Sequence, residues 1–503
     1  MSDLQENKKR TPRSKPAFLI TLASLFLIFV LPIVFILTVS FLLPAVYDET
    51  FVGELGEKYE LLNNTDEPKL VVVGGSSVAF GLDSEMVEKE IGMPVVNFGL
   101  YANLGTKLMI DLSKSNVNEG DIIILAPEMN AQTLSLYFNA DTAMQALDGN
   151  FEMLKHIDSE NYPDLAGALW GFSTDKLGYT VSANPPKNEG AYSKEWFNKY
   201  GDSTYDRPYN VMTMSSKNIT LDFCYDESDG INTEYEYFID YVNEYIEFCT
   251  DRGATVYFSF PPMNEASLTE YNTEENIRSF YENLSSSVNA KVISNINDYI
   301  LDEGYFFDSE FHLNNSGVVI RTVRLIDDIK RELGKTDITM KEDELPSPSG
   351  FAPVDFEDGN EENLYFDLEL MENGAGQSVW VIKGLNEEGK KQLRLSIPNN
   401  TGGYPIAVIS ESAFKGAELR TLTVGKNITT IASGAFGGAQ HLTAVYINAK
   451  NPDEITVPNN ADDNGLMTKG ANSQLNIYIP NESLGNFKTD YFWGDYAAIL
   501  KGY

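Results

Sequence analysis

Five short apolar runs within residues 69–294 constrain the fold of this chain more than any other feature. They are rich in Val, Ile and Phe, and stretches with helical periodicity separate them. Continuous apolar runs of this length are typical of parallel strands buried on both faces. Their alternation with helices predicts a doubly wound α/β sheet. The predicted strands are 69–74, 93–98, 121–126, 254–260 and 290–294, and the predicted helices are 83–91, 103–117, 233–252 and 273–287.

The N-terminal segment has the character of a membrane anchor. A cluster of Lys and Arg in residues 1–16 precedes an apolar run over 17–43, longer than the ~20 residues that span a bilayer. This run also exceeds the apolar core of a cleavable signal peptide, which is the alternative interpretation. The basic cluster favours a cytoplasmic N-terminus. We therefore expect a single-pass signal anchor in the cell membrane, with the bulk of the chain extracytoplasmic.

Composition limits the classes of ligand. The formal net charge of −37 argues against nucleic acid, whose phosphates bind Lys and Arg. Only three histidines occur and no motif has metal-ligand spacing, so we expect no metal site. Cys249 falls on the apolar face of the predicted helix 233–252. It is either a buried thiol or the partner of Cys224 in a disulfide.

Two distant motifs carry residues suited to nucleophilic catalysis. A Gly-Ser-Ser motif that ends at Ser77 follows the apolar run 70–73 directly. This places a serine on a strand-to-helix turn, where free backbone N–H groups can stabilise an anion. The segment 307–317 supplies an acid, Asp308, and a base, His312. A serine, an acid and a histidine on strand-end loops form the layout of a serine hydrolase or acyltransferase.

These motifs resemble the blocks of the SGNH/GDSL hydrolase superfamily. The resemblance implies a three-layer α/β/α domain that works without a cofactor, with Ser77 as the nucleophile and His312 as the base. The last family block normally reads Asp-x-x-His, and here Ser309 stands at the position of that Asp. Asp308, one residue earlier, is our choice for the acid, with Glu310 second.

The family's oxyanion-hole blocks are altered in this chain. The resemblance covers about residues 68–333 and places Ala102 at the family's glycine, with Gly99 nearby. A backbone N–H does not need glycine. Glu128 stands where the family has an asparagine, and a carboxylate cannot donate to an oxyanion unless it is protonated. Glu128 either orders the loop after Ser77 or lies near the substrate as a protonated acid. We take Gly99, Ala102 and Glu128 as candidate oxyanion or substrate-binding residues.

The domain organisation follows from changes in pattern. The SGNH-like domain spans 48–333 and carries an insertion at 130–230, rich in Tyr, Trp, Asn and Gly. The aromatic residues of the insertion either stack on sugar rings or form the core of a subdomain. Residues 334–362 contain a Pro-Ser-Pro-Ser-Gly stretch and an acidic run, which predicts a linker. Residues 363–503 then form a separate domain.

That domain contains an internal repeat. The pattern Ile-x-x-x-Ala-Phe-x-Gly begins at Ile409 and again at Ile431, which places Phe414 and Phe436 one period of 22 residues apart. A short strand, a turn and a buried Phe at such a period indicate a solenoid. Residues 400–500 resemble the leucine-rich repeats of the BspA type, and the resemblance implies a surface-binding array.

We therefore expect a membrane-anchored, extracytoplasmic serine esterase or O-acyltransferase. Its substrates would be acyl esters of cell-envelope or extracellular carbohydrate, and the repeats would bind a surface or matrix ligand. The alternative is a non-catalytic adhesion protein. In that case the repeats bind the partner and the SGNH-like domain is degenerate.

Overall fold

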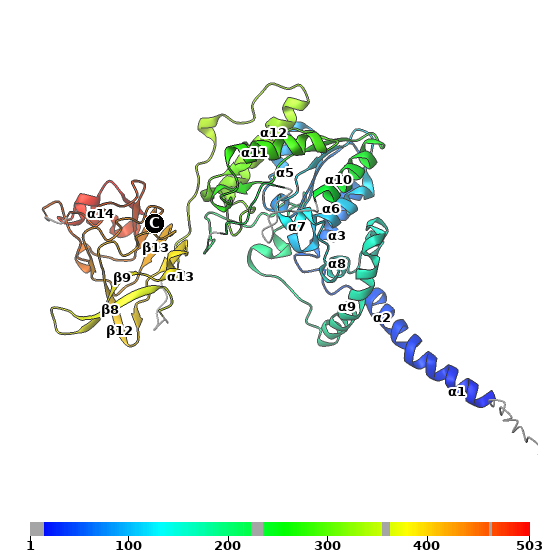
Figure 1. Ribbon diagram of the computed structural model, residues 1–503, viewed down its shortest axis with the longest axis horizontal. Helices are drawn as coiled ribbons and strands as arrows, with labels where there is room; N and C mark the ends of the chain where they lie inside the picture. The colour runs from blue at the N-terminus through cyan, green and yellow to red at the C-terminus, as the bar shows by residue number, and fades with distance from the viewer. Residues whose placement is uncertain (1–14, 215, 223–234, 355–362, 462–464) are drawn as a thin grey trace, which may run out of the picture. The chain divides into compact units, whose positions relative to one another are not determined.

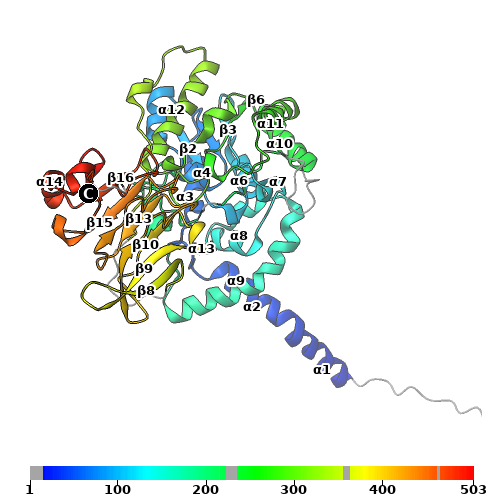
Figure 2. The same ribbon diagram turned by 60° about the vertical axis from the view of Figure 1, so that its left-hand side comes forward.

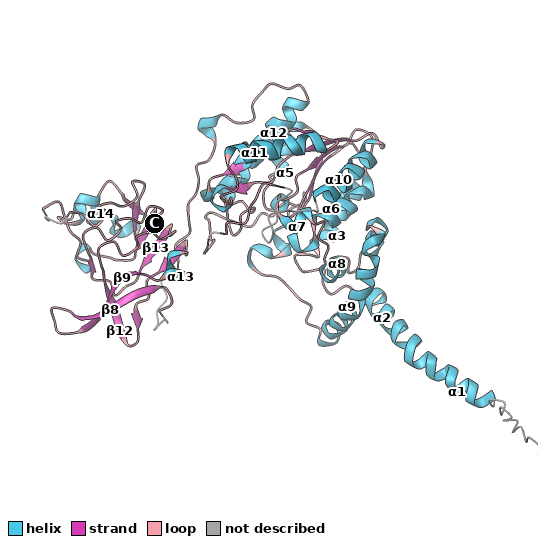
Figure 3. Ribbon diagram, in the orientation of Figure 1, coloured by secondary structure: helices cyan, strands magenta, loops and turns pink. Residues whose placement is uncertain are grey.

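The computed structural model, shown in Figure 1, describes residues 15–214, 216–222, 235–354, 363–461 and 465–503. The chain divides into two compact units. The first comprises Met1–Tyr205, Phe223–Phe260 and Asn283–Ile293, and the second comprises Asp206–Asp222, Pro261–Glu282 and Ser294–Tyr503. Helices are concentrated before residue 334, whereas the C-terminal part is built mainly from strands (Figure 3). Each unit is described by itself.

A five-stranded parallel sheet forms the centre of the first unit. Its strands follow the order β2, β1, β3, β4, β6, and every neighbouring pair is parallel. The first three strands in the chain are buried at every position, as strands covered on both faces should be. All five predicted strands are present, which confirms the α/β class. Their bounds are Leu70–Val73 (β1), Val95–Phe98 (β2), Ile122–Leu125 (β3), Thr255–Phe258 (β4) and Lys291–Val292 (β6).

The predicted helices between these strands are also present. The bounds are Ser84–Ile91 (α5), Thr106–Ser113 (α6), Tyr235–Thr250 (α10) and Glu274–Ser287 (α11). A further helix, Glu54–Asn64 (α3), precedes β1 and was not predicted from the sequence. Helices α3 and α5 contact β2, α6 contacts β1, and α10 contacts β4. The ends of α5 show how the sequence sets such bounds. Asp83 caps its N-terminus by accepting from Met86 N at 2.9 Å, and Gly92 ends it with a φ of +84°.

An apolar helix precedes the sheet of the first unit. It runs through α1 (Lys15–Leu25), a π-helical turn (Phe26–Val30) and α2 (Leu31–Leu42), drawn in blue in Figure 1. The 25 residues Phe18–Leu42 are long and apolar enough to span a membrane, and most of their side chains are exposed. Insertion into a membrane and the orientation of the chain across it stay predictions.

Lys176 joins the end of this helix to the rest of the first unit. It lies on α9 (Tyr162–Ser182), and its Nζ donates to Ser40 O at 3.1 Å and to Asp148 Oδ1 at 2.6 Å. Both members of the ion pair are fully buried. Asp148 Oδ2 also accepts from Val46 N at 2.8 Å. Buried polar contacts therefore hold the end of the apolar helix and the residues that follow it, so this segment is not a flexible linker.

The predicted insertion at 130–230 contains three α-helices in its described part, α7 (Ala131–Leu134), α8 (Ala140–Ala146) and α9. Its aromatic residues serve two roles. Phe172 and Tyr200 are buried, whereas Trp170 is exposed. The insertion therefore has an aromatic core and also presents aromatic rings at its surface.

Two sheets build the C-terminal part of the second unit, one all parallel and one that also contains antiparallel pairs. The strands of one sheet follow chain order: β10 (Arg394–Ser396), β13 (Thr421–Val424), β15 (Ala444–Ile447), β16 (Asn476–Ile479) and β17 (Leu500–Gly502). Figure 2 shows β10, β13, β15 and β16 side by side. The second sheet comprises β11 (Asn400–Thr401), β12 (Tyr404–Ile409), β9 (Ser378–Leu385) and β8 (Phe366–Glu372), with β14 (Thr430–Ile431) parallel to β12. Its pairs β8–β9 and β11–β12 are antiparallel. We call these two sheets the C-terminal array.

The interior of the array repeats with the period read from the sequence. The rings of Phe414 and Phe436 are stacked, with centroids 6.0 Å apart, and both are fully buried. The prediction of a buried Phe in each of these two repeats is thus confirmed. The turns stack in the same way, because Gly416 N donates to Gly438 O at 3.1 Å. Both glycines have positive φ, which other residues adopt only with strain.

Residues 334–354, the described part of the predicted linker, pack within the second unit. Phe351 is buried, and Asn210 N donates to Gly350 O at 2.8 Å. The guanidinium of Arg394, on β10, donates to three backbone carbonyls, those of Val211, Ala352 and Pro353. Hydrogen bonds therefore join the array to the rest of its unit. The acidic run at 355–362 lies outside the described residues.

Candidate functional site

Ser77 lies where β1 meets a short helix, α4 (Ser76–Ala79). Two glycines make this turn feasible. A Cβ on Gly74 would come within 2.6 Å of Ala126 O, and a Cβ on Gly75 within 2.2 Å of a Glu128 carboxylate oxygen. The Ser77 side chain is fully buried, and its Oγ has no hydrogen-bond partner among the described residues. The sequence thus supplies a strand-end serine with an unengaged hydroxyl.

Glu128 holds the backbone of Ser77. It follows β3, the strand next to β1, and its side chain is buried. Glu128 Oε1 accepts from Ser77 N at 2.8 Å. The carboxylate therefore orders the turn at Ser77, the first of the two roles left open by the sequence. It also occupies the N–H that we expect to stabilise an oxyanion, so this donor is engaged in the structure.

Asn97, near the end of β2, organises the loop that carries Gly99. Its Nδ2 donates to Val78 O at 2.9 Å, and its Oδ1 accepts from Gly99 N at 3.2 Å. A Cβ on Gly99 would lie 2.5 Å from Gly75 O, so glycine permits the close approach of the two loops. Ala102 is exposed in a 3₁₀ turn, and its carbonyl accepts from Gln132 Nε2 at 3.0 Å. Gly99 therefore packs the two loops together, and its own N–H is already engaged.

Asp202 is a buried acid of this site that the sequence analysis missed. Its carboxylate accepts from Asn97 Nδ2 at 2.8 Å and from Ser84 N and Oγ at 2.8 and 2.6 Å. Burial raises the pKa of Asp202, against the lowering effect of its hydrogen bonds. It positions Asn97 and, through it, the loop beside Ser77. No motif surrounds Asp202, so no sequence signal marks it.

The acid and the base of the predicted triad lie together in the second unit. His312 Nδ1 and Asp308 Oδ1 are 2.8 Å apart, and the imidazole is largely buried. The backbone closes around the pair, because Phe307 N donates to His312 O at 2.8 Å. Asn314 then caps α12 (Asn315–Glu332) by accepting from Gly317 N at 3.0 Å. A carboxylate bonded to Nδ1 fixes the ring so that Nε2 is the atom suited to exchange protons.

The other acidic candidate has different partners. Glu310 Oε1 accepts from the side chain of Asn218, and the Glu310 carbonyl accepts from Asn264 N at 3.0 Å. Ser309, at the family's Asp position, accepts through Oγ from His312 N at 3.2 Å. Of the two acids considered from the sequence, Asp308 is thus the one bonded to the imidazole.

The candidate residues divide between the two units. Ser77, Gly99, Ala102 and Glu128 belong to the first unit, and Asp308 and His312 belong to the second. The structure brings together Ser77 with Glu128, and Asp308 with His312. The pairing of Ser77 with His312 stays a prediction.

A cavity of about 620 Å³ lies in the first unit beside the loop that holds Ala102. Tyr101 and Asn103, the two neighbours of Ala102, line it. Three further tyrosines, Tyr47, Tyr179 and Tyr192, line the same cavity together with polar groups such as Gln145 and Asp175. Aromatic faces combined with amides and carboxylates suit a polyhydroxylated ligand. The sequence analysis did not foresee this cavity, because its lining comes from distant segments.

The structure also bears on the two cysteines and on metal binding. Cys249 is buried, and burial raises the pKa of its thiol to about 12, while Cys224 lies outside the described residues. No group of three or more His, Cys, Asp or Glu side chains in the described part of the chain has a geometry that could hold a metal ion.

A scan of protein-family models and a search of curated proteins returned no match to this chain.

Proposed function

We propose that this protein is a membrane-anchored, extracytoplasmic serine esterase or O-acyltransferase of the SGNH type. The observation that carries the proposal is the 2.8 Å contact between Asp308 and His312. An acid that orients a histidine is the base half of a nucleophilic triad. Ser77, with its unengaged hydroxyl on a strand-end turn, supplies the other half.

In the proposed reaction Ser77 Oγ attacks the carbonyl carbon of an acyl ester. His312 Nε2 takes the serine proton and returns it to the departing alcohol, which leaves an acyl group on Ser77. Water then attacks the acyl-enzyme in hydrolysis, or a carbohydrate hydroxyl attacks it in transfer. His312 again takes a proton, now from the attacking group, and returns it to Ser77. Asp308 remains ionised and stabilises the imidazolium.

Glu128 adds a requirement to this mechanism. Its carboxylate accepts the hydrogen bond of Ser77 N, and a negative charge at that position repels a developing oxyanion. The catalytic state therefore has Glu128 either protonated or turned away from Ser77 N. Ala102 N, on the exposed 3₁₀ turn, supplies the second donor of the oxyanion hole.

The choice of a carbohydrate substrate is supported by the tyrosine-lined cavity next to Ala102. Rings such as Tyr101 and Tyr192 can stack on the apolar faces of sugars, and the amides and carboxylates nearby can bind hydroxyl groups. We also propose that the C-terminal array is a set of leucine-rich repeats of the BspA type. It binds a surface or matrix ligand through its extended strands.

A fluorophosphonate probe tests the proposal on the full chain in detergent. The wild type should be labelled, Ser77→Ala should not, and the matched control Ser76→Ala should retain labelling. Mass spectrometry should place the adduct on Ser77. An absence of labelling in folded wild type at several pH values would contradict the enzyme hypothesis.

The burial of Ser77 and the Glu128 contact favour a second candidate, a non-catalytic adhesion protein with a degenerate α/β domain. Glu128→Gln distinguishes the two. Its amide can still accept from Ser77 N and can also donate to an oxyanion. If this variant also fails to react with the probe while it stays folded, the binding protein is the better description.

A further inference from the structure

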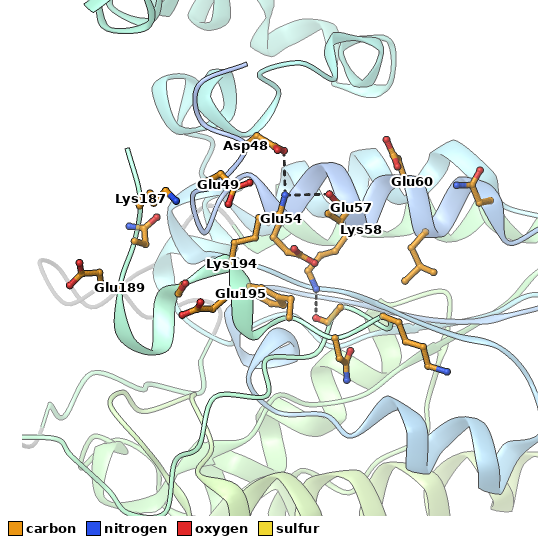
Figure 4. Close-up of a pocket in the computed structure, with 18 residues that line it drawn as sticks. Asp48, Glu49, Glu54, Glu57, Lys58, Glu60, Lys187, Glu189, Lys194 and Glu195 are labelled. Carbon is orange, nitrogen blue, oxygen red and sulfur yellow. Dashed lines mark hydrogen bonds and ion pairs between the residues drawn. The ribbon is translucent and has the colours of Figure 1, made fainter. Parts of the chain in front are cut away.

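A second cavity in the first unit has a different chemical character. It measures about 880 Å³ and lies between the start of α3 and the segment 187–201 (Figure 4). Charged side chains dominate its lining, with seven carboxylates and four lysines. They are Asp48, Glu49, Glu54, Glu57, Glu60, Glu189, Glu195, Lys58, Lys187, Lys194 and Lys199. The excess of negative charge favours a cation.

Glu54 differs from the other carboxylates of this cavity. It is the first residue of α3, and its side chain is only 4% exposed although it lines the cavity. In the described part of the chain, no hydrogen bond and no ion pair within 4 Å reaches its carboxylate. A largely buried carboxyl without a hydrogen-bond donor from the protein is unfavourable unless a ligand or water supplies one. Burial raises the pKa of Glu54 to about 7, against the lowering effect of Lys58 and Lys194.

The two nearest lysines are engaged elsewhere. Lys194 forms ion pairs with Asp48 and Glu57, each at 3.3 Å, as the dashed lines in Figure 4 show. Lys58 is fully buried, and its Nζ donates to the carbonyls of Asn97, at 3.0 Å, and Gly201. Neither lysine therefore supplies the donor that Glu54 lacks.

We propose that this cavity binds the primary ammonium group of a small organic amine, with Glu54 as its acceptor. An ammonium group brings the hydrogen-bond donors and the positive charge that Glu54 lacks. The surrounding carboxylates add long-range attraction. A bare metal ion fits less well, because the described carboxylates do not converge into a metal-binding group. The site does not depend on ester chemistry at Ser77.

The amine can be soluble or can belong to a lipid headgroup. Asp48 lines the cavity and is six residues from Leu42, the last residue of the apolar helix. Six extended residues span about 20 Å, so the chain keeps the cavity near the end of that helix. The shared chemistry is an ethanolamine-like ammonium group, and the experiment separates the two sources.

Ligand-detected NMR on the full chain in phosphatidylcholine nanodiscs tests the proposal, with ethanolamine as the probe. Ethanolamine should bind saturably, and choline, whose nitrogen has no N–H donor, should bind at least tenfold more weakly. Glu54→Gln should weaken ethanolamine binding at least tenfold. The matched control Glu85→Gln, an exposed carboxylate on α5 that does not line the cavity, should change it less than twofold.

Three results would overturn the site: no saturable binding to the wild type, equal binding of choline, or unchanged affinity in Glu54→Gln. The comparison of ethanolamine with choline needs no variant, so the test holds even if Glu54→Gln does not fold. Nanodiscs that contain phosphatidylethanolamine then identify the source. Competition with the soluble probe assigns a lipid headgroup, and its absence assigns a soluble amine. Because fluorophosphonate labelling reports on Ser77 alone, failure here is distinct from failure of the esterase proposal.

Discussion

The two units use parallel strand pairing in different ways. In the first unit the chain goes from β1 to β2 on one side and then to β3 on the other side of β1. In the array the strands β10, β13, β15, β16 and β17 follow one another in chain order. In the sheet of the first unit the direction in which strands are added therefore reverses after β2. In the array each new strand is added to the same edge of the sheet.

The reversal has a chemical consequence. The chain leaves β1 and β3 toward opposite edges of the sheet. Ligands of open α/β sheets bind at such a switch point, beyond the carboxyl ends of the two strands. Ser77 follows β1 and Glu128 follows β3. The candidate nucleophile and the carboxylate that accepts from its backbone N–H therefore meet at this switch point. The array has no reversal among these five strands. Its strands add to one edge in sequence, and the proposed binding of an extended partner depends on this arrangement.

The largest expected effect tests whether the assigned triad residues, and not the array, carry the chemistry. Asp308→Asn should lower ester hydrolysis by about 10⁴-fold, because the amide no longer holds the imidazole in the productive tautomer. Steady-state hydrolysis of a small acetyl ester measures this. Glu310→Gln is the matched control, since Glu310 contacts Asn218 and not the imidazole. A silent Asp308→Asn together with a damaging Glu310→Gln would reverse the assignment of the acid.

The second effect concerns the stability of the array. Phe436→Ala removes a fully buried ring from the stack and should cost ~3–5 kcal/mol of unfolding free energy. The exposed Phe492 provides the control, because Phe492→Ala should change stability by less than ~1 kcal/mol. Denaturant unfolding of the full chain in detergent measures both.

The same variant tests how far the array is independent. Arg394 bonds it to Val211 and Ala352, and Arg420 contacts Glu303. We therefore expect Phe436→Ala to destabilise α12 along with the array, measurable by hydrogen exchange. The linker predicted at 334–362 implies the opposite, an α12 that stays protected. Unchanged protection of α12 would restore that picture of two uncoupled domains.

The third effect concerns the switch point. Glu128→Gln should raise kcat for ester hydrolysis by about 10²-fold, since it removes the negative charge beside the oxyanion and adds a donor there. A rise in kcat with little change in KM would indicate an effect on the transition state. Glu128→Ala is the comparison, because it removes the charge without supplying a donor. A fall in activity for Glu128→Gln would show that this carboxyl acts as a catalytic acid.

The sequence predicted features that depend on local pattern or on a repeat. The continuous apolar runs gave all five strands of the first sheet, and the 22-residue period gave the stack of Phe414 on Phe436. The resemblance to the family's last block led to Asp308, one residue before the family's Asp position, and Asp308 is the acid bonded to His312.

Features that depend on distant segments were not predictable. The docking of Lys176 on Ser40 joins residues 136 positions apart, and the cavity at Glu54 needs the polar segment 187–201 to lie across α3. These segments have no periodicity or motif that indicates a partner. Glu128 falls between the two cases. Its position after the predicted strand 121–126 marked Glu128 as a candidate site residue. The choice between its two roles needed the contact with Ser77 N, which depends on how two distant segments pack.

The smallest expected effect is a pH-dependent loss of stability in the first unit that the array does not share. The pKa of Glu54 is raised from its ordinary 4.5 to about 7, so the folded first unit binds a proton that the unfolded chain releases. This contribution to stability is complete below pH 4.5 and is lost as pH rises through 7. Lys58, whose pKa burial lowers to about 8, stays mostly protonated in this window.

Between pH 5 and 7.5 the linkage predicts a loss of about 2 kcal/mol from the first unit. Hydrogen exchange of α3, corrected for the intrinsic effect of pH, measures this loss, and β13 in the array serves as the internal reference. Glu54→Gln should abolish most of the pH-dependent change in α3, because its amide does not titrate, whereas Glu60→Gln should leave that change intact. If α3 and β13 lose protection equally, or if Glu54→Gln retains the full change, the proton is not bound at Glu54. The pH response then belongs to the chain as a whole, and the contrast between the two units does not extend to their titration.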